Sequence, residues 1–215
     1  MSTMVREAIT GYPVNLVVDG RRCVVVGAGR IAARKITPLL DAGAQVHVVA
    51  PEVGDDVRRL TRDGRITIDE RAFVPADLDG AWLATTATGV PEVDRSVFEA
   101  GEARRVWVNS ADDPGNCSFT LMSVVRRGDL VVSVGTGGRS PALAAWLRRR
   151  LTDELGPEYE TLLDLLAEAR ESMRATGRST EDADWQRALD SGMLDLIRAG
   201  RTGDAKEMLR ACLSS

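Results

Sequence analysis

The sequence predicts an α/β fold: a Rossmann-type, mostly parallel sheet, then a small α+β region and a C-terminal helical domain. Over the first half of the chain, short β-rich runs alternate with helical periodicity, which is typical of a parallel sheet covered on both faces. The rhythm changes after Pro114, where two further strands and a helix are expected. From Pro157 onward, apolar residues recur only at helical spacing.

Length and composition indicate a folded globular protein. The chain has 215 residues, of which 44% are hydrophobic and 28% are charged, and this composition excludes disorder. No apolar run approaches the ~20 residues of a membrane helix, and residues 1–10 lack a signal core, so we expect a cytoplasmic protein without membrane association. The formal net charge of −4 disfavours nucleic-acid binding, because phosphate affinity comes largely from excess Lys and Arg.

The elements of the first half are predicted in order. Two β-rich runs, 14–18 and 22–26, flank the turn signal Asp19-Gly20-Arg21 and predict an opening hairpin. The elements expected after this hairpin are helices over 31–40, 51–62 and 90–100 and strands over 46–49, 65–69, 81–86 and 106–108.

The second half is expected to contain strands over 118–125 and 130–134, a helix over 141–155 and an all-helical tail. These changes divide the chain into three parts, 1–116, 117–155 and 156–215. The tail is too short to bury a generous core by itself, so we expect it to pack on the rest of the chain or on a partner subunit.

Cysteine and histidine offer no metal site. Cys23, Cys117 and Cys212 are odd in number and far apart, so they form neither a disulfide framework nor a zinc site, and we interpret them as packed thiols. The single histidine, His47, lies within an apolar alternation and is expected to be structural.

A glycine motif follows the strand at 22–26 and opens the next helix. Gly27, Gly29 and Ala32 form G-x-G-x-x-A in a βαβ context, which predicts a Rossmann dinucleotide site with a pyrophosphate at the helix N-terminus. Glu52 follows the next strand, where a carboxylate on the adenine ribose favours NAD over NADP. Alternatively, Glu52 is a first-turn carboxylate that complements a helix dipole.

Two further strand ends carry polar residues, and ligands of open α/β sheets lie at such ends. The small and hydroxyl residues of 84–89 could admit a nicotinamide or form an ordinary turn. Asp112 and Asp113 precede Pro114, where a carboxylate could handle a proton or form a turn.

Motifs in chain order carry a resemblance to a known family. They lie at 12–14, 26–35, 49–52, 109–114, 118–119 and 135–141, the last reading Gly-Thr-Gly-Gly-Arg-Ser-Pro. Together they resemble the siroheme synthase family, and more narrowly its precorrin-2 dehydrogenase/sirohydrochlorin ferrochelatase module. We expect no methyltransferase module within these residues.

The resemblance implies NAD-dependent oxidation of precorrin-2 to sirohydrochlorin, with ferrous iron as a further substrate in members that also make siroheme. It places the catalytic aspartate at Asp112, leaves Asp113 to the turn, and implies a homodimer formed through 117–155. A serine that some members phosphorylate corresponds to Thr136. Cofactor contacts fall on Arg30, Ile31, Pro51 and Glu52, beside Gly27 and Gly29 of the motif.

Local cations suit an anionic tetrapyrrole, although some of them could equally form a solvated helix face. They are Arg126, Arg127, Arg139, Arg148, Arg149 and Arg150. Ser140 and Pro141 suit the N-cap and first position of a helix. Three alternatives stay open: a dehydrogenase with a separate chelatase, a dehydrogenase of another anionic substrate, and a non-enzymatic NAD sensor.

Overall fold

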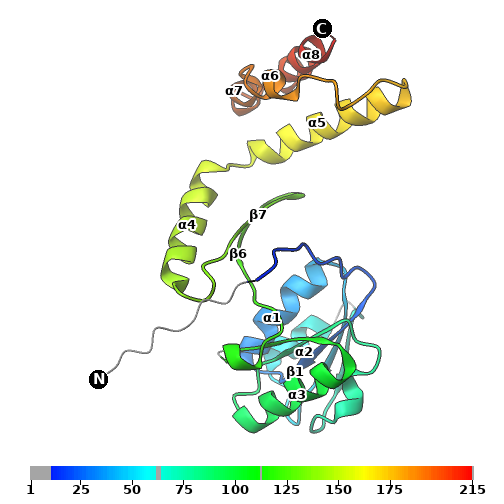
Figure 1. Cartoon of the computed structure of the whole chain (residues 1–215), viewed down its shortest axis with the longest axis vertical. Coiled ribbons are helices and arrows are strands. Elements are labelled where there is room, and N and C mark those ends of the chain that lie inside the picture. The colour runs from blue at the N-terminus through cyan, green and yellow to red at the C-terminus, as the bar shows by residue number, and fades with distance from the viewer. Residues whose placement is uncertain (1–10, 62–63, 112, 215) are drawn as a thin grey trace. The chain divides into compact units, whose positions relative to one another are not determined.

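The computed structural model describes residues 11–61, 64–111 and 113–214, which fall into two compact units. The N-terminal unit ends at Leu121, and the C-terminal unit begins at Met122 (Figure 1). The expected boundary at 116 differs because Ser118 donates its backbone N–H to the Val108 carbonyl and Phe119 packs on the core of the N-terminal unit.

The N-terminal unit contains a five-stranded sheet in which every pairing is parallel. Its strands are β1 (Arg22–Val26), β2 (Gln45–Val49), β3 (Ile66–Asp69), β4 (Leu83–Thr86) and β5 (Trp107–Ser110), in the order β3-β2-β1-β4-β5. The predicted parallel sheet is confirmed. The order reverses between β1 and β4, and ligands of such sheets bind in the crevice at this switch point.

Helices cover both faces of the sheet (Figure 1). Helices α1 (Arg30–Asp41) and α2 (Asp55–Leu60) share one core cluster with alternate residues of β1 and β2. Helix α3 (Pro91–Arg104) and the 3₁₀ turn Pro75–Leu78 pack on the other face, around Val24, Val97 and Val108. Because all five strands run parallel, their carboxyl ends lie along the same edge of the sheet.

Three predicted elements are wrong in place or kind. Residues 14–18 form no strand, because β1 already pairs with β2 and β4 and has no edge left for a hairpin partner. The helix expected from Pro51 begins only at Asp55. The residue before it, Gly54, donates its N–H to the Ala28 carbonyl at 3.0 Å. The strand expected from Ser118 begins only at Ser123.

The C-terminal unit begins with an antiparallel pair, β6 (Ser123–Arg127) and β7 (Leu130–Val134), against which α4 (Pro141–Glu154) packs. Helices α5 (Glu158–Ala175), α6 (Trp185–Leu189), α7 (Met193–Arg198) and α8 (Thr202–Leu213) share their own hydrophobic cluster. The all-helical tail is confirmed. None of the described helices has both the length and the apolarity to cross a membrane.

Candidate cofactor and active site

Gly27 brings the end of β1 against the turn that follows β4. Its φ of +102° belongs to the region that favours glycine, and a Cβ at this position would lie 2.5 Å from the Ala87 carbonyl oxygen. The Gly27 N–H also donates to the Val49 carbonyl at 2.9 Å. The loop is therefore held between the carboxyl ends of β2 and β4.

Gly29 leaves the N-terminus of α1 open. Among the described residues, no side chain caps this terminus and no carboxylate occupies its first turn. A Cβ on Gly29 would meet nothing within 4 Å, whereas Ala32 is fully buried beneath the loop. Free N–H groups at a helix N-terminus attract anions, so this cradle fits the pyrophosphate of a dinucleotide.

The structure brings the other predicted cofactor residues to the same edge. Arg30 and Ile31 are exposed in the first turn of α1, and Pro51 and Glu52 are exposed after β2. Glu52 lies outside α2, whose first-turn carboxylates are Asp55 and Asp56. The alternative interpretation of Glu52 as a first-turn carboxylate is therefore wrong.

Asp112, the predicted catalytic residue, lies outside the described residues. The residues on either side of it, Ala111 and Asp113, form hydrogen bonds that the structure describes. The Ala111 N–H donates to the Thr86 carbonyl at 2.9 Å. Asp113 accepts the Gly115 N–H at 3.1 Å and the Asn116 side-chain N–H at 2.8 Å. The interpretation of Asp113 as a turn residue is confirmed.

Sequence reasoning missed the side chains that anchor this loop. Lys35 on α1 donates to Asn109 Oδ1 at 2.9 Å, and Asn109 Nδ2 donates to the Phe119 carbonyl at 3.0 Å. The Cys117 thiol accepts the Ser110 N–H at 3.2 Å, and burial raises the pKa of this thiol. The position of Asn109 directly after a strand was the only sequence signal for this role.

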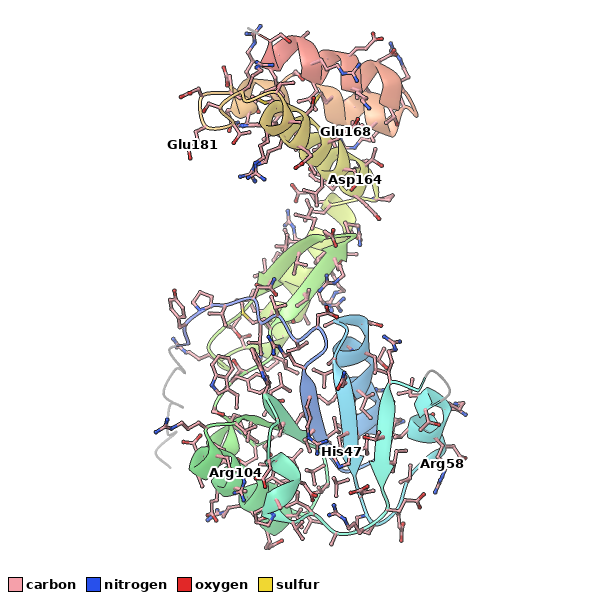
Figure 2. The ribbon with its side chains drawn as sticks, turned by 90° about the vertical axis from the view of Figure 1, so that its right-hand side faces the viewer. His47, Arg58, Arg104, Asp164, Glu168 and Glu181 are labelled. Atoms are coloured by element: carbon pink, nitrogen blue, oxygen red, sulfur yellow. The ribbon has the colours of Figure 1, made fainter. Side chains whose placement is uncertain are left out.

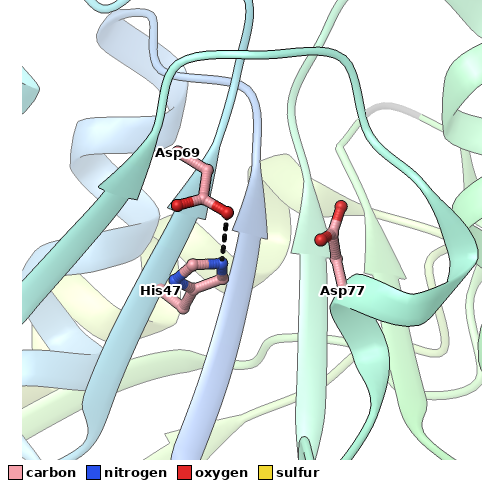
Figure 3. Close-up of side chains that lie close together, drawn as sticks. All are labelled: His47, Asp69 and Asp77. Carbon is pink, nitrogen blue, oxygen red and sulfur yellow. Dashed lines mark ion pairs between the residues drawn. The ribbon is translucent and has the colours of Figure 1, made fainter.

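His47 on β2 is in register with Val24 on β1, whose side chain packs in the core cluster on the α3 side of the sheet. Figure 2 shows His47 within the sheet. His47 Nδ1 lies 2.8 Å from Thr67 Oγ1, and Nε2 lies 3.6 Å from Asp69 Oδ2 (Figure 3). His47, Asp69 and Asp77 could together offer metal ligands, but Arg71 pairs with both carboxylates at 2.6 Å. Because the Arg71 guanidinium already pairs with both carboxylates, we interpret the cluster as a structural ion-pair network.

Acid is expected to destabilise the protein through His47. Burial, and then the charge of Arg22, lower the pKa of His47 below its usual 6.5. The unfolded chain therefore binds this proton more tightly than the folded chain. The stability that the neutral His47 contributes is fully present above about pH 6.5 and is lost as the pH falls through the folded pKa.

Urea midpoints at about pH 7.5 and about pH 5.5 test this dependence on the only histidine of the chain. The wild type should lose stability at the lower pH, and His47→Gln should lose less. Equal losses in both proteins would contradict the assignment.

Two of the six predicted cations have local roles in the C-terminal unit. Arg127 donates to the Leu155 and Thr152 carbonyls at 2.6 and 2.8 Å, so it caps the end of α4. Arg150 stacks over Trp146 at 5.3 Å from the ring centroid, while Arg126 and Arg139 are exposed. An anionic substrate would therefore meet fewer free cations than composition predicts.

Hydroxyl groups form hydrogen bonds within the glycine-rich segment 135–140 and with the start of α4, which follows it. Ser140 caps the helix by accepting the Leu143 N–H at 3.2 Å, as predicted. The Thr136 hydroxyl accepts the Ser140 N–H at 3.2 Å and donates to the Ser140 carbonyl at 3.1 Å. Thr136 therefore stabilises the loop that precedes the helix.

Comparisons with known proteins show what this chain is similar to. The model of a family described as "Putative NAD(P)-binding" matches residues 14–123. The siroheme synthase of Nitrosococcus oceani is 34% identical over 203 residues, covering 94% of this chain and 43% of that protein. The siroheme synthase of Methylobacillus flagellatus is 35% identical over 205 residues, covering 94% and 44%. The chain thus spans less than half the length of these relatives.

A solved structure supports the fold. "SirC, precorrin-2 dehydrogenase" matches with a TM-score of 0.73 and 23% identity over 94% of this chain and 100% of that chain. The predicted α/β fold class is confirmed. The chain belongs to the NAD(P)-binding family whose model covers residues 14–123, and its predicted resemblance to the siroheme synthases is confirmed.

Proposed function

We propose that this protein oxidises precorrin-2 to sirohydrochlorin with NAD as the hydride acceptor. The observation that carries the proposal is the open glycine loop at the switch point between β1 and β4, in a chain similar to siroheme synthases along 94% of its length. The structural neighbour named precorrin-2 dehydrogenase has the same fold.

The reaction removes two hydrogens from the tetrapyrrole, one as hydride and one as a proton. Bound NAD supplies the hydride acceptor. Gly27 and Gly29 admit the pyrophosphate, and the first turn of α1 donates backbone N–H groups to it. Asp112 accepts the proton, and the anchored residues Ala111 and Asp113 hold its loop at the end of β5.

Insertion of ferrous iron into sirohydrochlorin is the proposed second activity, because the relatives are named siroheme synthases. Iron is a substrate in this step, and the macrocycle supplies its nitrogen ligands. Asp112 assists deprotonation of the pyrroles.

An anaerobic absorbance assay tests both activities. Wild-type protein with precorrin-2 and NAD should form NADH and sirohydrochlorin, and added ferrous iron should enter sirohydrochlorin faster than in an enzyme-free control. Oxidation without faster iron insertion would indicate a dehydrogenase with a separate chelatase. NAD binding without oxidation would favour the NAD sensor or another anionic substrate.

Glu52 is proposed to select NAD by binding the hydroxyls of the adenine ribose. Glu52→Arg is therefore expected to lower the ratio of KM for NADP to KM for NAD by about tenfold or more. The reason is that it replaces a carboxylate, which repels the 2′-phosphate of NADP, by a guanidinium, which attracts it. Steady-state kinetics with both cofactors measures this ratio. Glu102→Arg, at an exposed position near the C-terminal end of α3, is the matched control and should leave this ratio unchanged. An unchanged ratio in Glu52→Arg would contradict the role.

The protein is also proposed to be a homodimer that pairs through β6, β7 and α4. Large apolar side chains are exposed on these elements: Val124 at 43%, Val131 at 40%, Leu143 at 48% and Trp146 at 46%. Patches of this kind are typical of protein interfaces.

Leu143→Asp is expected to give a monomer in sedimentation velocity, because a carboxylate would be buried in the interface. Leu189→Asp is the matched control: this leucine is similarly exposed, at 43%, but lies on α6. A dimer that survives Leu143→Asp, or a monomeric wild type, would contradict the proposed interface.

A further inference from the structure

We propose that Asp94 is a positioning residue that holds the turn between β4 and α3 as one wall of the cofactor crevice. This inference rests on the proposed function, because it concerns the binding of the same cofactor. Asp94 lies in the first turn of α3 and is 6% exposed.

Two hydroxyl groups bind the Asp94 carboxylate. Thr86, the last residue of β4, donates its hydroxyl to Asp94 Oδ1, and Thr88 donates to the same oxygen at 2.6 Å. The Val90 N–H donates to the Thr88 hydroxyl oxygen at 3.0 Å. This chain of hydrogen bonds connects the end of β4, the turn and the start of α3.

The carboxylate is buried without a cation. In the described part of the chain no Lys or Arg forms an ion pair with Asp94; the threonine hydroxyls and the N-terminal dipole of α3 stabilise its charge. Burying such a group is costly unless its hydrogen bonds are made. The network therefore restrains the two threonines more strongly than an ordinary turn would.

The restrained turn directly contacts the glycine loop. The Ala87 N–H donates to the Val26 carbonyl at 2.9 Å. A Cβ on Gly27 would lie 2.5 Å from the Ala87 oxygen and 3.2 Å from the Thr88 nitrogen. The Ala87–Thr88 peptide thus faces the glycine loop across the switch point between β1 and β4, and a shift of this peptide would change the crevice that admits the dinucleotide.

Loss of Asp94 is expected to act on cofactor binding more than on the sheet. In Asp94→Ala, β4 should keep its pairing with β1 and β5, whereas Thr86 and Thr88 would lose the oxygen that accepts both of their hydroxyl groups. Asp94→Ala should raise the Kd for NADH, measured by fluorescence titration, by about tenfold or more. Asp94→Asn keeps an oxygen that can accept both hydroxyls and should restore most of the affinity.

Two further comparisons separate positioning from stability. Asp77→Ala removes a carboxylate that is also 6% exposed but belongs to the ion-pair cluster, so it should lower the Tm with an unchanged Kd. Thr88→Val removes the hydroxyl of a partly exposed residue and should raise the Kd for NADH, whereas Thr88→Ser should not.

The outcomes distinguish this inference from the proposed function. If Asp94→Ala and Thr88→Val bind NADH like the wild type while Asp94→Ala melts earlier, as Asp77→Ala does, Asp94 is only structural and the inference is wrong. If the wild type itself binds no NADH, the proposed function fails and the inference fails with it. If the wild type binds NADH and Asp94→Asn does not rescue Asp94→Ala, hydroxyl acceptance is not the role of Asp94.

Discussion

Replacing Asp112 by alanine is expected to lower kcat for precorrin-2 oxidation by about 10²- to 10⁴-fold, the range typical of a lost general base. The Kd for NADH should stay close to that of the wild type, because the glycine loop and α1 supply the pyrophosphate contacts. Anaerobic turnover assays and fluorescence titration measure the two effects separately.

Asp113 provides the matched control for Asp112. Asp113→Asn keeps an oxygen that can accept the Gly115 N–H and loses only the acceptor of the Asn116 side chain, so the variant should melt earlier but keep the turn and an activity near that of the wild type. Wild-type turnover in Asp112→Ala would show that the proton leaves by another route. Equal losses in the two variants would indicate that the loop conformation, and not the Asp112 carboxylate, is responsible.

Alanine replacements of the two glycines of the loop are expected to differ in their effects on NADH binding and on stability. Gly29→Ala should fold normally, since its Cβ meets nothing within 4 Å, but this Cβ would occupy the space that the pyrophosphate needs. Its Kd for NADH should rise by about tenfold or more. Gly27→Ala should also lose stability, on the order of 1–3 kcal/mol or more, because its φ is +102° and its Cβ would meet the Ala87 oxygen.

Thermal unfolding and NADH titration of the same samples separate these effects. Gly80→Ala is the control for positive φ alone: its φ is +73°, nothing lies within 4 Å, and it precedes β4 at the opposite edge of the sheet. It should lose some stability and bind NADH normally. Normal NADH binding by Gly29→Ala would place the pyrophosphate elsewhere.

The sequence by itself determined the class of the fold and the position of the glycine loop. Alternating strand and helix patterns predicted the parallel sheet, and helical spacing predicted the tail, because these periodicities reflect which side chains each element buries. Gly27 and Gly29 could be identified because their spacing, directly after a strand, is a local property of the chain.

Only the tertiary structure decided which segments meet. The hairpin expected at 14–18 does not form because both edges of β1 are taken by strands that lie later in the chain. The bond between Lys35 and Asn109 joins residues 74 positions apart, and the Asp94 network depends on where α3 starts relative to β4. The Lys35 hydrogen bond arises from packing between distant elements, and the Asp94 hydrogen bonds depend on the residue at which a helix begins. The periodicity of buried side chains encodes neither.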